Sequence, residues 1–91
     1  MELIAVIKRI YPIQYFKNNF QKREFIVLTE ERFPQKLIIE VHNLRTDIVD
    51  PFKVGDRVRI GINIIGCEYI DRNNTVKYFN NIVAWKIVHM T

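Results

Sequence analysis

The stretch Asn43-Leu44-Arg45-Thr46-Asp47-Ile48-Val49-Asp50-Pro51 breaks the pattern of the rest of the chain and decides which fold the sequence encodes. Elsewhere, apolar residues recur mostly at every second position in short runs rich in Ile and Val, which is typical of β-strands. In this stretch Leu44 and Ile48 are four residues apart, Asn43 can cap a helix, and Pro51 stops it. The segment therefore predicts one or two helical turns between strands.

The strand that opens the chain is expected to bend. Apolar side chains alternate from Leu3 to Ile7, but the next inward candidate is Ile10, three residues further on. Lys8 and Arg9 are therefore expected to form a β-bulge, which bends a strand as a small closed barrel requires.

Two more strands are expected before the helix, at about residues 24–30 and 36–42, with Phe33-Pro34 in the turn between them. Each places alternate side chains on opposite faces. In the second, the side chains predicted to point inward are Leu37, Ile39 and Val41, and those predicted to point outward are Lys36, Ile38, Glu40 and His42.

The region after the helix predicts a hairpin. Val54-Gly55-Asp56 forms a turn into a fourth strand, and Asp71-Arg72-Asn73-Asn74 is a hairpin turn signal before a fifth strand at about residues 76–88. The side chains expected to share one face of the fourth strand are Val58, Ile60, Ile62 and Ile64.

Together these elements predict an all-β protein: a five-stranded Greek-key OB-fold barrel with a short helix between strands 3 and 4. An SH3-like barrel also has five short strands, but it usually carries only a short 3₁₀ turn late in the chain. With 91 residues, the chain is expected to form a single domain over residues 1–91.

Composition limits the class of protein. The chain is 48% hydrophobic and 26% charged, as expected of a globular protein, and its net charge of +4 favours anionic partners. Cys67 is the only cysteine, so a disulfide within the chain and a cysteine-rich zinc site are excluded, and a cytoplasmic location is expected. The apolar run at the N-terminus follows no basic leader and is much shorter than the ~20 residues of a membrane span, so no membrane partner is expected.

The loop over residues 14–23 carries three aromatic residues among three cations, without the apolar period that would bury the rings. Bases stack on such rings and phosphates are attracted to the cations, so the loop predicts a site for single-stranded nucleic acid. In the alternative interpretation, the rings fold back and cover one end of the barrel. The candidate binding residues of this loop are Tyr15, Phe16, Lys17, Phe20, Lys22 and Arg23.

A second loop, over residues 69–79, repeats this chemistry and is expected to close over the same groove from the other side. Lys36 projects from the outward face of the third strand and is a further candidate, whereas Trp85 lies in an apolar strand and is predicted to be core. The candidates in the second loop are Tyr69, Arg72, Lys77, Tyr78 and Phe79.

Several motifs resemble a family of short, largely uncharacterised OB-fold proteins related to bacterial single-stranded-DNA-binding protein. The most specific are Glu24-Phe25, Phe33-Pro34 and Ala84-Trp85-Lys86, and the resemblance covers nearly the whole chain. It implies that Phe33 occupies the position of a stacking tryptophan and that His42 replaces an aromatic residue.

Nothing in the sequence indicates an enzyme or a cofactor. The chain has no serine and no Gly-rich phosphate loop, its carboxylates are dispersed, and His42 and His89 are not at a spacing that would bind a metal. No catalytic residue, cofactor or metal is therefore expected.

The sequence predicts a non-enzymatic, sequence-tolerant single-stranded-DNA-binding protein that acts in replication, recombination or repair. The alternatives are a protein-interaction or structural OB module and an RNA-binding OB protein, because RNA and DNA share all of this evidence. A homo-oligomer, dimer or tetramer, is also expected, since outward apolar positions such as Ile26, Leu28 and Ile38 suit a subunit interface as well as a base.

Overall fold

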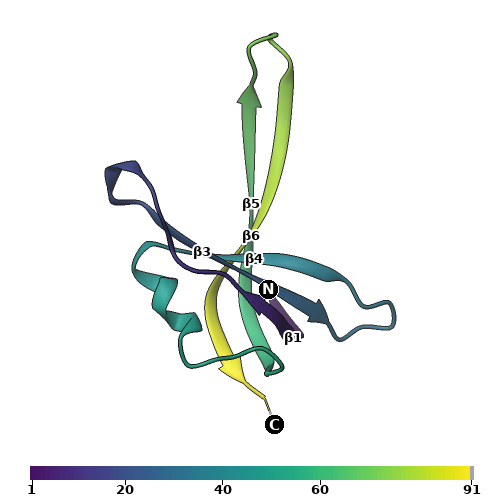
Figure 1. Cartoon of the computed structure of the whole chain (residues 1–91). Helices are drawn as coiled ribbons and strands as arrows, with labels where there is room; N and C mark the ends of the chain where they lie inside the picture. Colours follow the sequence, from purple (N-terminus) through teal and green to yellow (C-terminus); the bar gives the residue numbers. More distant parts are fainter. Residues whose placement is uncertain (91) are drawn as a thin grey trace.

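The computed structural model describes residues 1–90 of the chain. All of its strands belong to one β-sheet (Figure 1). Its strands lie in the order β1-β5-β6-β4-β3-β2, and an additional pairing between β1 and β3 closes the sheet into a barrel. The elements in chain order are β1 (Glu2–Ile10), β2 (Gln14–Tyr15), the 3₁₀ helix η1 (Lys17–Asn19), β3 (Gln21–Thr29), β4 (Lys36–His42), the 3₁₀ helix η2 (Asn43–Val49), β5 (Arg57–Ile70) and β6 (Val76–His89).

This architecture is the predicted OB barrel with its short helix between the third and fourth long strands. Neighbouring strands are antiparallel except β4 and β6, which pair in parallel through Ile39 with Ile82 and Glu40 with Val83. β1 changes register between Ile7 and Arg9 where it pairs with β3, so the predicted bulge is confirmed. The bulge lets one strand bend enough to pair with both β3 and β5.

The core consists of the inward side chains of the five long strands and of η2. Phe25 is the largest of the fully buried side chains, and each such apolar side chain contributes about 1.5–3 kcal/mol through its burial. The buried apolar residues are Ala5, Ile7, Phe25, Val27, Ile39, Val41, Val49, Val58, Ile60, Ile62 and Ala84.

The helix η2 is in the predicted place, but Leu44 and Ile48, whose four-residue spacing indicated the helix, do not share a buried face. Leu44 is 95% exposed, whereas Thr46 and Val49 are buried. The reason is the helix type: a 3₁₀ helix has three residues per turn, so positions three apart share a face. Nor does Asn43 cap the helix; its side-chain Oδ1 accepts a hydrogen bond from the backbone N of Gln21 at 3.2 Å.

Residues 14–23 form an ordered hairpin and not the free loop that was predicted. The short strand β2 pairs with the start of β3, Gln14 with Lys22 and Tyr15 with Gln21, and η1 makes the turn. The sheet therefore has six strands and not five, and β3 begins at Gln21 instead of about residue 24. Asn18 and Asn19 both have positive φ, 63° and 61°, a conformation that asparagine tolerates better than most residues.

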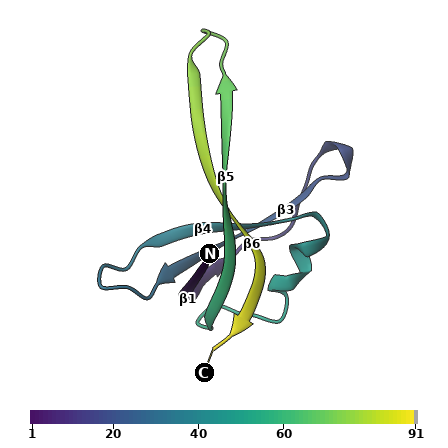
Figure 2. The ribbon, with the colours of Figure 1, turned by 180° about the vertical axis from the view of Figure 1, so that it is seen from behind.

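The strands β5 and β6 continue past the barrel as a two-stranded arm that ends at the turn over residues 71–74 (Figures 1 and 2). Ile64, which was predicted to share the buried face with Ile62, is 57% exposed because it lies where the arm leaves the barrel. The arm comprises residues 64–82 and contains Cys67, which is free and exposed.

Trp85 was predicted to be core, and this was wrong: the side chain is 40% exposed. The register of β5 and β6 shifts here, because Gly61 pairs with Lys86 and Ile62 pairs with Ala84. Trp85 is thus the extra residue of a bulge, and its indole packs over the adjacent Gly61 on the outside of the barrel.

Candidate nucleic-acid interface

The hairpin of residues 14–23 brings four of the predicted binding residues around one hollow of about 650 Å³. Phe16 and Phe20 lie with their ring centroids 5.7 Å apart at an interplanar angle of 51°, and the Nζ of Lys22 is 5.6 Å from the centroid of Phe16. Lys17 completes the lining. We call this site the hairpin hollow; it presents two rings and two cations to solvent.

The three aromatic residues of the hairpin have different environments. Phe16 is 50% exposed and Tyr15 is more exposed still. Phe20 is half-buried and packs edge-on against His42, with the two ring centroids 5.2 Å apart. Phe20 therefore agrees in part with both interpretations of the sequence, a ring that covers the barrel and a ring that is available for stacking. One part of it covers the end of β4, and another part lines the hollow.

Arg23 was predicted as a phosphate contact, but it serves the barrel instead. Its Nε donates a hydrogen bond to the backbone O of Tyr11 at 3.1 Å, and its Nη1 donates to Asp50 Oδ1 at 2.6 Å and to the backbone O of Thr46 at 3.5 Å. The side chain is only 17% exposed. Its position in β3, next to η2, commits the guanidinium to these partners, so we correct this assignment.

The outward side chains of β3 and β4 face each other in four cross-strand pairs, which we call rungs. The second of these pairs is acidic. Glu24 lies opposite Glu40, and each carboxylate is close to a cation or a histidine of the neighbouring rung: Glu24 to Lys22 at 3.9 Å and Glu40 to His42 Nε2 at 2.9 Å. Glu40 was predicted to point outward, yet it is only 8% exposed because His42 and the neighbouring strand β6 cover it. The rungs are Lys22 with His42, Glu24 with Glu40, Ile26 with Ile38 and Leu28 with Lys36.

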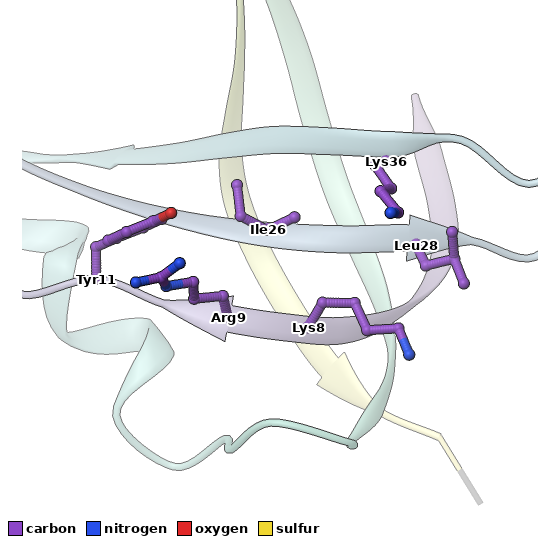
Figure 3. Close-up of a pocket in the computed structure, with 6 residues that line it drawn as sticks. All are labelled: Lys8, Arg9, Tyr11, Ile26, Leu28 and Lys36. Carbon is purple, nitrogen blue, oxygen red and sulfur yellow. The ribbon is translucent and has the colours of Figure 1, made fainter.

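A second hollow, of about 500 Å³, lies on the outer face of β1, β3 and β4 (Figure 3). Of its residues, Lys36 was a predicted contact, and Ile26 and Leu28 were predicted to suit a base or a subunit interface; Lys8, Arg9 and Tyr11 were missed. The bulge at Lys8 and Arg9 was recognised in the sequence and could have indicated them, because a bulge turns adjacent side chains out of strict alternation. We call this site the β1 groove, and it is lined by Lys8, Arg9, Tyr11, Ile26, Leu28 and Lys36.

The predicted residues of the second loop lie on the arm and do not share one face. By the pairing register, Tyr78 lies opposite Glu68 on one face and Tyr69 lies opposite Lys77 on the other, together with Phe79. The arm and the hairpin leave the barrel in different directions (Figures 1 and 2), so the structure does not bring these two sets of residues together over one groove.

The arm residues also interact with one another. Tyr69 and Phe79 pack edge-on with centroids 6.5 Å apart, Lys77 Nζ lies 3.5 Å from Asp71 Oδ2, and the hydroxyl of Tyr78 donates to Glu68 Oε1 at 3.1 Å. Arg72 is exposed in the turn.

Phe33, the proposed counterpart of a stacking tryptophan, is exposed in the turn between β3 and β4. The guanidinium of Arg32 lies 5.5 Å from its ring centroid. Because β3 runs from the hairpin to this turn, Phe33 lies at the opposite end of β3 from Phe20.

Within residues 1–90, no group of three or more His, Cys, Asp or Glu side chains is arranged to hold a metal ion. No helix in the same range has the length and apolar character needed to cross a bilayer.

Comparison with known proteins supports the fold. No curated protein sequence matches the chain. The chain is similar in structure to the mitochondrial single-stranded DNA binding protein Rim1 of S. cerevisiae, with a TM-score of 0.71 at 11% identity over 99% of this chain and 92% of that one. At this identity the likeness is one of fold, the same OB barrel that the strand pairing describes. The resemblance drawn from the sequence to a largely uncharacterised family is confirmed as well, since the model of the family described as a domain of unknown function (DUF3127) matches residues 2–88, and the chain belongs to that family.

Proposed function

We propose that the protein binds single-stranded DNA without strong sequence preference and without catalysing a reaction. The observation that carries the proposal is the hairpin hollow, where Phe16 and Phe20 stand beside Lys17 and Lys22. Rings beside cations suit unpaired nucleotides, because every base has a face that can stack and every link carries a negative charge. A role in protecting single strands during replication, recombination or repair is part of this proposal.

The energies involved are sufficient for useful binding. Stacking on an aromatic side chain contributes about 1–3 kcal/mol per base, and each phosphate contact adds a term that depends on salt. Micromolar affinity corresponds to about 8 kcal/mol, which two stacked bases and several phosphate contacts together can supply. Similarity of fold to a protein named for single-stranded DNA binding supports the same proposal.

The test is a fluorescence-anisotropy titration of the full chain with labelled oligo-dT and with a duplex of equal length, at a low and a moderate salt concentration. We expect oligo-dT to bind more tightly than the duplex and its affinity to fall steeply with salt. Equal affinity for both, or no binding to either, removes the proposal. An oligo-rU of the same length, measured in parallel, separates DNA from RNA, which the fold alone does not distinguish.

A second candidate, a protein-interaction module that self-associates, is favoured by the arm. Its exposed apolar side chains lie on both faces, Ile64 and Ile70 on one and Ile65 and Tyr69 on the other, and an isolated two-stranded ribbon is only marginally stable in water. Coverage of the arm by a second copy would give the predicted homo-oligomer. An interface of this kind depends little on salt, in contrast to binding of DNA.

A further inference from the structure

The β1 groove is the second place on the barrel where cations surround an apolar surface. Figure 3 shows Ile26 and Leu28 on β3, with Lys8 and Arg9 of β1 along one side. Lys36 enters from the opposite side, and the ring of Tyr11 lies at one end.

The bulge of β1 is what places two cations side by side. Ile7 pairs with Val27 and Arg9 pairs with Ile26, which leaves Lys8 as the extra residue of the bulge. Both Lys8 and Arg9 are exposed, and the guanidinium carbon of Arg9 lies 4.9 Å from the ring centroid of Tyr11. A cation above a ring is attracted to its face, so this contact holds Arg9 at the end of the groove.

Among residues 1–90, no negatively charged side chain lines the groove to neutralise its positive charges. The residues that line it include three cations and no carboxylate. Like charges that converge on one hollow repel each other, and an anion placed among them relieves this repulsion. The apolar floor of Ile26 and Leu28 and the ring of Tyr11 suit a flat base better than a polar anion alone.

An acidic rung separates the β1 groove from the hairpin hollow. Along the outward face of β3, Lys22 belongs to the hairpin hollow, Glu24 follows opposite Glu40, and Ile26 and Leu28 belong to the groove. From Lys22 to Leu28 the strand rises about 20 Å, at roughly 3.3 Å per residue. The two carboxylates repel phosphate, so a bound strand would keep its phosphates away from this rung and make its ionic contacts on either side of it.

From this arrangement we infer that the β1 groove is a second subsite for the same single strand, which would cross the acidic rung with its bases and contact Lys8, Arg9 and Lys36 with its phosphates. This inference rests on the proposed function and deepens it, because it makes binding bipartite. An oligonucleotide too short to span the rung occupies one subsite, and a longer one occupies both.

The test compares the full chain with a Lys8→Gln/Arg9→Gln variant, using oligo-dT of about 3 nucleotides, too short to span the ~20 Å from Lys22 to Leu28, and oligo-dT of about 15 nucleotides, within the range of site sizes of OB folds. We expect the variant to bind the longer oligonucleotide at least tenfold more weakly. Each lost phosphate contact lowers the slope of log affinity against log salt by about 0.7, so the slope for the longer oligonucleotide should fall by about 1.4. Affinity for the shorter one should change less than threefold.

The matched control is Arg59→Gln/Lys86→Gln, which removes two exposed cations of β5 and β6 that line neither hollow. It should leave the salt slope within about 0.3 of the wild-type value. Lys36→Gln tests the opposite wall of the groove and should lower the slope by about 0.7.

The possible failures are distinguishable. If the wild-type chain binds neither oligonucleotide, the proposed function itself is wrong. A different failure is that the wild type binds while Lys8→Gln/Arg9→Gln keeps the salt slope of the control variant, or loses affinity equally for the short and the long oligonucleotide. In either case the groove is not a second subsite, whereas the proposed function stands. Thermal melting of each variant shows whether it is folded.

Discussion

The indole of Trp85 packs so closely on Gly61 that a Cβ added at Gly61 would lie 2.7 Å from both Cε2 and Cζ2 of the ring. Real Cβ atoms essentially never approach that closely, so a larger residue at Gly61 would force the ring to shift; the constraint comes from this contact and not from the backbone angle. The contact explains how β6 accommodates a bulge, because the ring of the extra residue covers a position on β5 that has no side chain.

We predict that Gly61→Ala destabilises the protein by about 1–3 kcal/mol, the usual result of overpacking. The control is Gly66→Ala, where the nearest atom to the added Cβ is Asn80 Oδ1 at an ordinary 3.7 Å; it should change stability by less than about 0.5 kcal/mol. Urea denaturation followed by circular dichroism measures both. A Gly61→Ala/Trp85→Leu double variant should recover part of the loss, and additive effects would contradict the contact.

Phe16→Ala should weaken binding of oligo-dT about 5- to 150-fold, the equivalent of one stacked base, without lowering the melting temperature. The ring is half exposed and lies on a hairpin outside the core, so its loss removes binding surface more than it removes packing. Leu44→Ala removes a fully solvated apolar side chain from η2 and should leave affinity unchanged. Equal affinity of Phe16→Ala and wild type would show that stacking occurs elsewhere.

For Arg23 we predict an effect on stability and not on the affinity of the folded protein. Arg23→Gln should destabilise the barrel by about 1.5–3 kcal/mol, because the guanidinium donates to two backbone carbonyls between β3 and η2. Asp50→Asn should have an effect below about 1 kcal/mol, since the carboxylate is largely exposed and solvent screens the pair. A lower salt slope for oligo-dT with Arg23→Gln, at a temperature where the variant is folded, would restore Arg23 as a phosphate contact.

Stability should depend on pH through Glu30. Arg57 donates two hydrogen bonds to its carboxylate, from Nε at 2.5 Å and from Nη2 at 2.9 Å, and these hold the pKa of Glu30 below its usual value of 4.5. Desolvation acts in the opposite direction, and the positive charge of Arg57 adds to the lowering of the pKa. Because the pKa is lower in the folded state, the stabilisation is present above about pH 4.5 and is lost as pH falls through the folded-state pKa.

Glu30→Gln should therefore flatten the dependence of the urea midpoint on pH between about pH 6 and pH 3, relative to the wild type. Glu2→Gln serves as the control, since Glu2 is exposed and makes no ion pair within residues 1–90. If Glu30→Gln and Glu2→Gln give parallel pH curves, the pair with Arg57 does not stabilise the fold.

The arm offers a test of self-association. Hydrogen exchange of amides in residues 66–80 should be faster than in the barrel at low protein concentration, because few buried contacts hold a two-stranded ribbon. Protection should rise with concentration, in step with the mass measured by light scattering, if a second copy covers the arm. Exchange that does not depend on concentration, in a chain that stays monomeric, would exclude this interface.

The fold was largely predictable because the pattern of apolar residues that determines it involves residues only a few positions apart in the sequence. Alternation placed Phe25, Val27 and Ile39 inward, and the two cations that precede Ile10 indicated the bulge. The change of period after His42 indicated a helix at η2. The four-residue spacing of Leu44 and Ile48 did not show that the helix is a 3₁₀ helix, in which Thr46 and Val49, three residues apart, are the buried residues.

The candidate site was predictable only in part. The hairpin residues Phe16, Phe20 and Lys22 were predicted and come together, whereas Lys8 and Tyr11 were missed because they meet Lys36 only across three strands. Whether a side chain is free to bind depends on partners far away in the sequence.

By itself the amino-acid sequence determined the class of fold, the order of the five long strands along the chain, the position of the helix between β4 and β5 and the surplus of positive charge, because each depends on composition or on residues a few positions apart. The tertiary structure alone decided that Arg23 holds η2, that Trp85 lies outside on Gly61, and that the cations of β1 face Lys36 across an apolar floor. The physical reason is that these contacts join strands whose relative register and curvature follow from the bulges and the closure of the barrel, which no short window of sequence contains.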